Sequence, residues 1–240
     1  MRKRLSWLVV VGVVGLLCVP TLQADDVTEW ATGSGATAGG QPVSASAVIT
    51  VGPGGTVTVQ LFNNQANPIS RSQAVSGLII FFSDGTTSGT ITSSSSTLIN
   101  INSDGSVTNL GSTSTGWKTE ASSGGLSICT ICPNTGNAFA PPSNLLIGPP
   151  DSGGTYSAAN ASITGIFPGP PDPWLQTAAT FNLNIPGLSP GATVVGVIFL
   201  FGTDSEQVPG VLIPEPGTMA LVGTGLIAIG RQLRRRRKSA

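Results

Sequence analysis

Histidine is absent from this chain of 240 residues, and charged residues make up only 9% of it. Without histidine, the commonest general base and metal ligand is missing. There is no Gly-x-Ser-x-Gly motif for a nucleophilic serine, and the acidic residues show no spacing typical of a catalytic carboxylate pair. The scattered acids include Asp84, Asp104, Glu120, Asp151 and Asp172. We therefore expect no enzyme activity, no metal site and no cofactor.

The two signs of charge are separated along the chain. Between Asp25 and Glu215 lie 2 basic and 11 acidic residues, a net of −9, and the two basic ones are Arg71 and Lys118. All other Lys and Arg residues lie near the two ends. An acidic middle repels polyanions, so no nucleic-acid partner is expected.

Residues 1–24 have the layout of a secretory signal peptide. Three basic residues precede the apolar stretch Leu5–Val19, and a short polar segment ends at Ala24. We predict export and cleavage after Ala24. The alternatives are an uncleaved signal anchor and acylation at Cys18, which the large Leu17 before that cysteine disfavours.

The C-terminal residues 214–240 form a second targeting segment. Pro214, Glu215 and Pro216 precede an apolar stretch, and a basic tail, 234–240, ends the chain with Arg234, Arg235, Arg236, Arg237 and Lys238. Residues 217–233 are predicted to be a short transmembrane helix with this tail on the cytoplasmic side. The alternatives for the basic run are a nucleic-acid or nuclear-import patch and a solvated tail. Neither suits an exported chain.

The order and spacing of these three parts resemble the PEP-CTERM sorting signal. The resemblance covers only about the last 27 residues. It implies a Gram-negative bacterium and an exosortase that recognises and processes the segment near Pro214–Pro216. It also implies an inner-membrane-anchored precursor, a mature form at the cell surface or in the extracellular matrix, and association with exopolysaccharide or biofilm. The two prolines favour an extended segment, which suits a processing enzyme.

The region between the two signals is predicted to be a single all-β domain, residues 25–207, followed by a linker, 208–213. Alternating or continuous apolar runs predict strands, and Gly/Pro-rich turns between them favour a β-sandwich or jelly roll. The region 130–173 is expected to form mainly long loops. The predicted strands are 43–51, 56–62, 78–82, 97–101, 107–110, 145–147, 156–166, 181–185 and 193–201.

Two kinds of short motif have a structural and a chemical interpretation. Asp84-Gly85 and Asp104-Gly105 are typical of tight turns; calcium loops would need more oxygen ligands at close spacing. Cys129 and Cys132 form a CxxC pair, for which a local disulfide is favoured in an exported protein. Free thiols, or a redox or metal site, are the alternatives.

The few aromatic residues could bind sugars or pack in the core. The candidates are Trp30, Trp117, Tyr156 and Trp174. Core packing is the commoner role, but Trp174 follows a proline-rich stretch and is the best candidate for an exposed glycan-stacking platform. We therefore expect a non-catalytic surface or matrix protein, with a glycan-specific carbohydrate-binding module or adhesin as the alternative.

Overall fold

The computed structural model describes residues 25–133, 144–165 and 173–214. This part of the chain contains strands, turns and two short 3-10 helices, η2 (Pro53–Gly55) and η3 (Arg71–Gln73), and no α-helix. The strands are β1 (Asp26–Thr32), β2 (Thr37–Ala38), β3 (Gln41–Pro42), β4 (Ala45–Val51), β5 (Thr56–Asn63), β6 (Val75–Phe82), β7 (Thr90–Ile101), β8 (Val107–Thr113), β9 (Lys118–Ser122), β10 (Gly125–Cys129), β11 (Leu146–Ile147), β12 (Trp174–Asn184), β13 (Val194–Phe201) and β14 (Glu206–Ile213).

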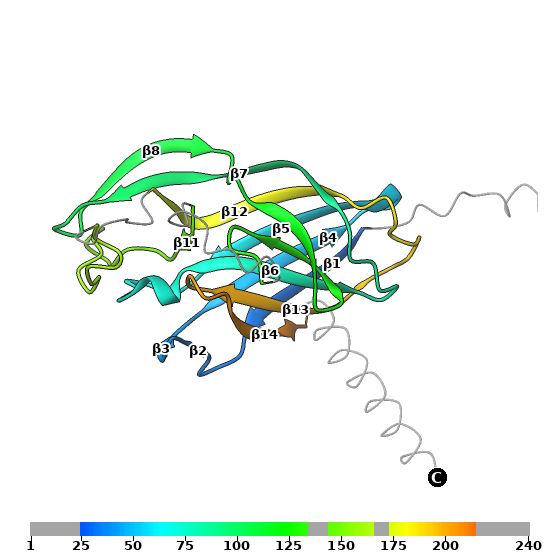
Figure 1. Ribbon diagram of the computed structural model, residues 1–240, viewed down its shortest axis with the longest axis horizontal. Coiled ribbons are helices and arrows are strands. Elements are labelled where there is room, and N and C mark those ends of the chain that lie inside the picture. The colour runs from blue at the N-terminus through cyan, green and yellow to red at the C-terminus, as the bar shows by residue number, and fades with distance from the viewer. Residues whose placement is uncertain (1–24, 134–143, 166–172, 215–240) are drawn as a thin grey trace, which may run out of the picture.

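Eight of these strands close into a β-barrel. The ring runs β12-β5-β4-β1-β14-β13-β6 and returns to β12 through the short strand β11. β11 pairs parallel to β12, with Leu146 opposite Leu175, and antiparallel to β6, with Leu146 opposite Val75. Figure 1 shows β12, β5, β4 and β1 running side by side in one wall. The all-β prediction is confirmed, whereas the sandwich is replaced by a closed barrel with extra strands.

Four further strands extend the sheet beyond the ring. β7 and β8 continue from β12, and β10 and β9 continue from β6. The Thr119 hydroxyl donates to the Gly89 carbonyl over 2.7 Å, so the start of β9 lies against the segment that leads into β7.

The main core fills the barrel, because alternate residues of the wall strands point inward. In β4 and β5 every second side chain is buried, including Ile49, Val59 and Leu61. Phe181 of β12 packs beside Trp117, with ring centroids 5.2 Å apart. Strict alternation along neighbouring strands therefore leaves a second, outward set of side chains on the same wall.

A buried asparagine fastens the end of the barrel at which the ring closes. The Asn63 amide donates to the carbonyls of Gln73 and Leu146, each over 2.9 Å, and its oxygen accepts the Gln65 N–H. Asn63 ends β5 and is fully buried. It thus ties β5 to η3 and to the closing strand β11.

Two expectations about segments that the structure describes are corrected. Residues 208–213, expected as a linker, belong to β14, which pairs with both β1 and β13. The domain therefore extends to Ile213. Residues 156–165, expected as part of a strand, form turns. Their Tyr156 hydroxyl donates to the Gly148 carbonyl over 2.8 Å, which holds this loop against the core.

Both Asp-Gly sequences form turns, as predicted, with φ of 75° at Gly85 and 80° at Gly105. The Asp84 carboxylate also joins two loops, because it accepts N–H groups from Thr86 and Ser189 over 3.1 and 2.7 Å. The Ser189 N–H is the main cause that lowers the pKa of Asp84 to about 2. This exposed carboxylate connects the end of β6 to the loop before β13.

Candidate functional site

The folded domain continues directly into the segment predicted to be processed. Leu212 pairs with Trp30 and Ile213 with Glu29, so β14 is hydrogen-bonded to β1 up to its last residue. Pro214 follows at once and is exposed. The preceding Val211, Leu212 and Ile213 are 58%, 49% and 38% exposed. An enzyme acting just after Pro214 would therefore meet an apolar strand end of the barrel.

The other predicted targeting residues lie outside the described part of the chain. They are the signal peptide 1–24 with Cys18, then Glu215, Pro216, the span 217–233 and the tail 234–240 with Arg234, Arg235, Arg236, Arg237 and Lys238. Among the residues that the structure does describe, no helix is long and apolar enough to cross a membrane.

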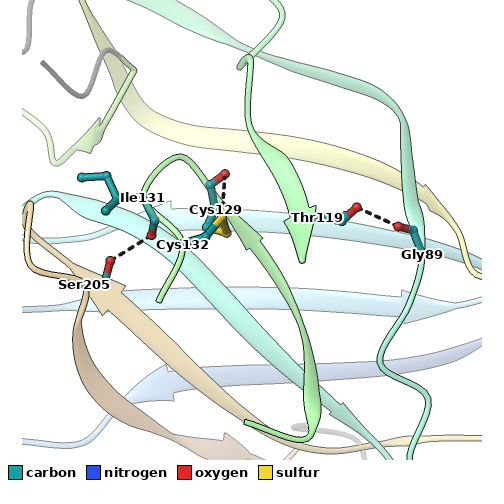
Figure 2. The surroundings of a disulfide bond; sticks show 6 residues. All are labelled: Gly89, Thr119, Cys129, Ile131, Cys132 and Ser205. Carbon is teal, nitrogen blue, oxygen red and sulfur yellow. Dashed lines mark hydrogen bonds between the residues drawn. A yellow bond between two sulfur atoms is a disulfide. The ribbon is translucent and has the colours of Figure 1, made fainter. Parts of the chain in front are cut away.

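Cys129 and Cys132 are joined by a disulfide bond, the pairing that the sequence favoured. Cys129 is buried against Ile79 and Leu200, while Cys132 is only partly buried. In the same loop the Ile131 carbonyl accepts a hydrogen bond from the Ser205 hydroxyl over 2.9 Å, as Figure 2 shows. The bridge therefore shapes a loop that leaves β10 and rests on the turn between β13 and β14.

All four proposed sugar-binding aromatics are buried, which corrects the prediction for Trp174. The exposed fractions are 6% for Trp30, 5% for Trp117, 1% for Tyr156 and 0% for Trp174. Trp174 is the first residue of β12 and packs in a second core cluster with Ile99, Ile101 and Ile147. The proline-rich stretch before it suggested a loop, but the strand begins at the tryptophan itself.

An aromatic ring that the sequence analysis did not select lies on the outer wall. Phe62 is partly exposed and follows Thr58 and Gln60 along the outward row of β5. Directly opposite it on the two neighbouring strands are Ser46 and Ala178. The signal was present in the sequence, because alternation that turns Val57, Val59 and Leu61 inward turns Phe62 outward.

Hydroxyl and amide side chains make up most of the rest of this wall. Register aligns Thr50, Thr58, Asn182 and Ser93 in one row across β4, β5, β12 and β7. A second row contains Val48, Gln60, Thr180 and Ser95. None of these strands contains Asp, Glu, Lys or Arg. The wall can donate and accept hydrogen bonds but carries no charge.

Within the three described ranges, no group of three or more Cys, Asp or Glu residues is placed to hold a metal ion. The acids there are dispersed. Asp104 accepts hydrogen bonds from Ser106, and Asp151 accepts them from Ser157 and Thr155, and these bonds lower the pKa of both carboxyls. These carboxylates stabilise their own turns.

Comparison with known proteins identifies the C-terminal segment. The family profile of the PEP-CTERM protein-sorting motif matches residues 212–237. No curated protein and no solved structure matches the chain. The match begins at Leu212, inside β14, so the motif and the barrel share the end of that strand. The chain thus carries a C-terminal PEP-CTERM protein-sorting motif, which implies export, processing by an exosortase and sorting to the cell surface.

Proposed function

We propose that this protein is a non-catalytic component of the bacterial cell surface or extracellular matrix, held among exopolysaccharide. The precursor is anchored in the inner membrane by residues 217–233 and processed near Pro214–Pro216. Its mature part is the barrel. The observation that carries this proposal is the direct passage of β14 into the sorting motif, with no spacer after Ile213.

The position of β14 supports the proposal that processing leaves an intact domain. The strand lies inside the ring, between β1 and β13, and its last pair joins Ile213 to Glu29. A cut after Pro214 removes no residue that pairs in the sheet. A stable, disulfide-containing barrel is then left outside the inner membrane, in the oxidising compartment that suits the Cys129–Cys132 bridge.

Composition supports a binding or structural role over catalysis. The chain has no histidine. Asp84, Asp104 and Asp151 accept hydrogen bonds from backbone and hydroxyl donors in their turns, and no acid lies on the hydroxyl-rich wall. A polysaccharide hydrolase would need two acids facing one sugar-binding surface.

Sorting is tested by expressing the full chain in a host with an exosortase and in the same host lacking it. Mass spectrometry of the exported protein should show loss of the arginine tail only when the enzyme is present. A triple variant, Pro214→Ala, Glu215→Ala and Pro216→Ala, should keep the tail and remain in the inner-membrane fraction. An intact Ala240 on surface protein from the exosortase-containing host would refute the proposal.

The alternative is a carbohydrate-binding module or adhesin that recognises a specific glycan. The uncharged outer wall with its partly exposed Phe62 favours this more specific role. Glycan binding distinguishes the two: a matrix component without a defined site would bind no purified sugar polymer, whereas a binding module would.

A further inference from the structure

We propose that the outer face of β4, β5, β12 and β7 binds an uncharged polysaccharide, with Phe62 as the residue on which a sugar ring stacks. This develops the alternative carbohydrate-binding role, and it rests on the proposed function for the location of the domain among exopolysaccharide. The binding itself is a property of the wall and can be tested independently of sorting.

The absence of charged side chains on this face favours an uncharged ligand. Within the described strands, charged residues occur only in β1, β9 and β14. The four strands of the proposed face lie next to one another, and the edge strand β8 beyond them is also free of charge. A phosphorylated, sulfated or uronic-acid polymer would find no counter-charge there, and the net charge of −9 between Asp25 and Glu215 would repel it.

The polar groups on this face are held in a connected row. The Thr58 hydroxyl donates to the Asn182 side-chain oxygen over 3.1 Å, and the Asn182 amide donates to the Ser93 hydroxyl over 2.8 Å. Asn182 and Ser93 are exposed. Each hydroxyl keeps capacity for a further hydrogen bond. The row therefore presents preordered donors and acceptors, which is the complement of a chain of sugar hydroxyls.

Phe62 supplies the apolar contact that such a hydroxyl surface lacks. Its cross-strand neighbours Ser46 and Ala178 are small, so neither can cover the ring as a large side chain would. Asn64 donates to the Ser46 hydroxyl over 3.0 Å, which places a hydrogen-bonding pair beside the aromatic. An aromatic face next to amide and hydroxyl groups matches the apolar face and polar rim of a pyranose ring.

The backbone at this point is unusual. The pairing of β12 with β7 shifts between Gln176 and Ala179, and Thr177 within that shift has a φ of +63°. A β-branched residue rarely adopts a positive φ, and such strain is concentrated at functional positions. The bulge ends at Ala178, the residue opposite Phe62. It therefore bends β12 beside the proposed stacking position.

The experiment uses the full chain purified in a mild detergent and measures retention on immobilised polysaccharides. The probes are dextran, mannan and cellulose as neutral polymers and alginate as an anionic one. We expect retention on at least one neutral polymer and none on alginate. Phe62→Ala should weaken that binding about tenfold or more, as expected from losing one well-placed aromatic contact. Asn182→Ala should weaken it less.

Three controls separate binding from folding and sorting. Phe62→Leu keeps an apolar side chain but removes the aromatic ring, and it should still lose binding. Val211→Ala removes an exposed apolar side chain from β14 and should bind like the unaltered chain. Thermal unfolding of each variant checks the fold. Failure to bind any neutral polymer, unchanged binding by both Phe62 variants, or preference for alginate would overturn the inference. Loss of sorting with intact binding would count against the proposed function alone.

Discussion

Two arcs of the barrel wall, β4-β5-β12 and β1-β14, face the same core but carry different side chains on their outer surfaces. Both contribute to one shared core, Ile49 and Val59 from β4 and β5, and Trp30 and Val208 from β1 and β14. Outside, β4, β5 and β12 carry hydroxyls, amides and Phe62, whereas β1 carries the exposed Glu29 and β14 ends in an exposed apolar run. Inner residues therefore form the core, whereas the outer residues carry the proposed glycan-binding face on one arc and lead into the sorting motif on the other.

The largest expected loss of stability comes from a comparison of a buried and an exposed residue of the same strand, β12. Phe181→Ala should lower the free energy of unfolding by about 3–5 kcal/mol, because it empties space in the core beside Trp117. Asn182→Ala, one residue later on the exposed face, should change it by about 0.5 kcal/mol or less. Chemical denaturation measures both. Similar losses in the two variants would show that the outer face is structural and would remove the contrast.

The next effect tests the packing of the arc that joins the sorting motif. A Cβ on Gly210 would lie 2.4 Å from Val197 Cγ2 and 3.1 Å from a Phe199 ring carbon. Gly210→Ala should therefore destabilise the domain by about 1–3 kcal/mol through overpacking. Val211→Ala, which changes the outward neighbour, serves as the control and should be close to neutral. If Gly210→Ala is also neutral, β14 is packed more loosely than the rest of the ring.

Loss of the disulfide should have a smaller effect on stability, and it should not affect either arc. Replacing Cys129 and Cys132 together by serine should lower stability by about 1–2 kcal/mol, since the bridge closes only a short loop. Reductant should lower the stability of the unaltered chain by a similar amount and leave the double variant unchanged. Glycan binding should persist in both cases, because the bridge lies at the end of β10 and not on the proposed face. Loss of glycan binding would show that the disulfide loop affects the proposed face.

The smallest expected effect is the pH-dependent contribution of Asp84 to the stability of the fold. The pKa of Asp84 is lowered in the fold from its usual 3.8 to about 2, so its ionised form stabilises the folded state. That contribution is complete above about pH 5 and disappears as the pH falls through about 2. Because the group is exposed, we expect Asp84→Asn to cost only about 0.5 kcal/mol at pH 7 after allowing for solvent screening. Thermal unfolding across this pH range measures it, and a cost that persists below pH 2 would contradict this account.

Strand prediction succeeded where apolar residues alternate or cluster. Residues 56–62 and 193–201 become most of β5 and β13, because their inward positions are continuous with the core. It failed for Ser93–Ser96 in β7, where serines carry no such signal and pairing with β12 determines the conformation. It also failed for β14, whose Pro209 and Gly210 are typical of a linker. Tertiary pairing overrode local propensity at both places.

The sequence by itself determined the handling of this protein, because a sorting signal is a linear order of prolines, apolar residues and arginines that an enzyme reads locally. Only the tertiary structure decided the shape of the domain and which aromatics are accessible. Barrel closure depends on β11, a two-residue strand whose partners lie far away in the sequence. The same long-range pairing buries Trp174 and leaves Phe62 on the outer wall, since exposure depends on which strands pack together.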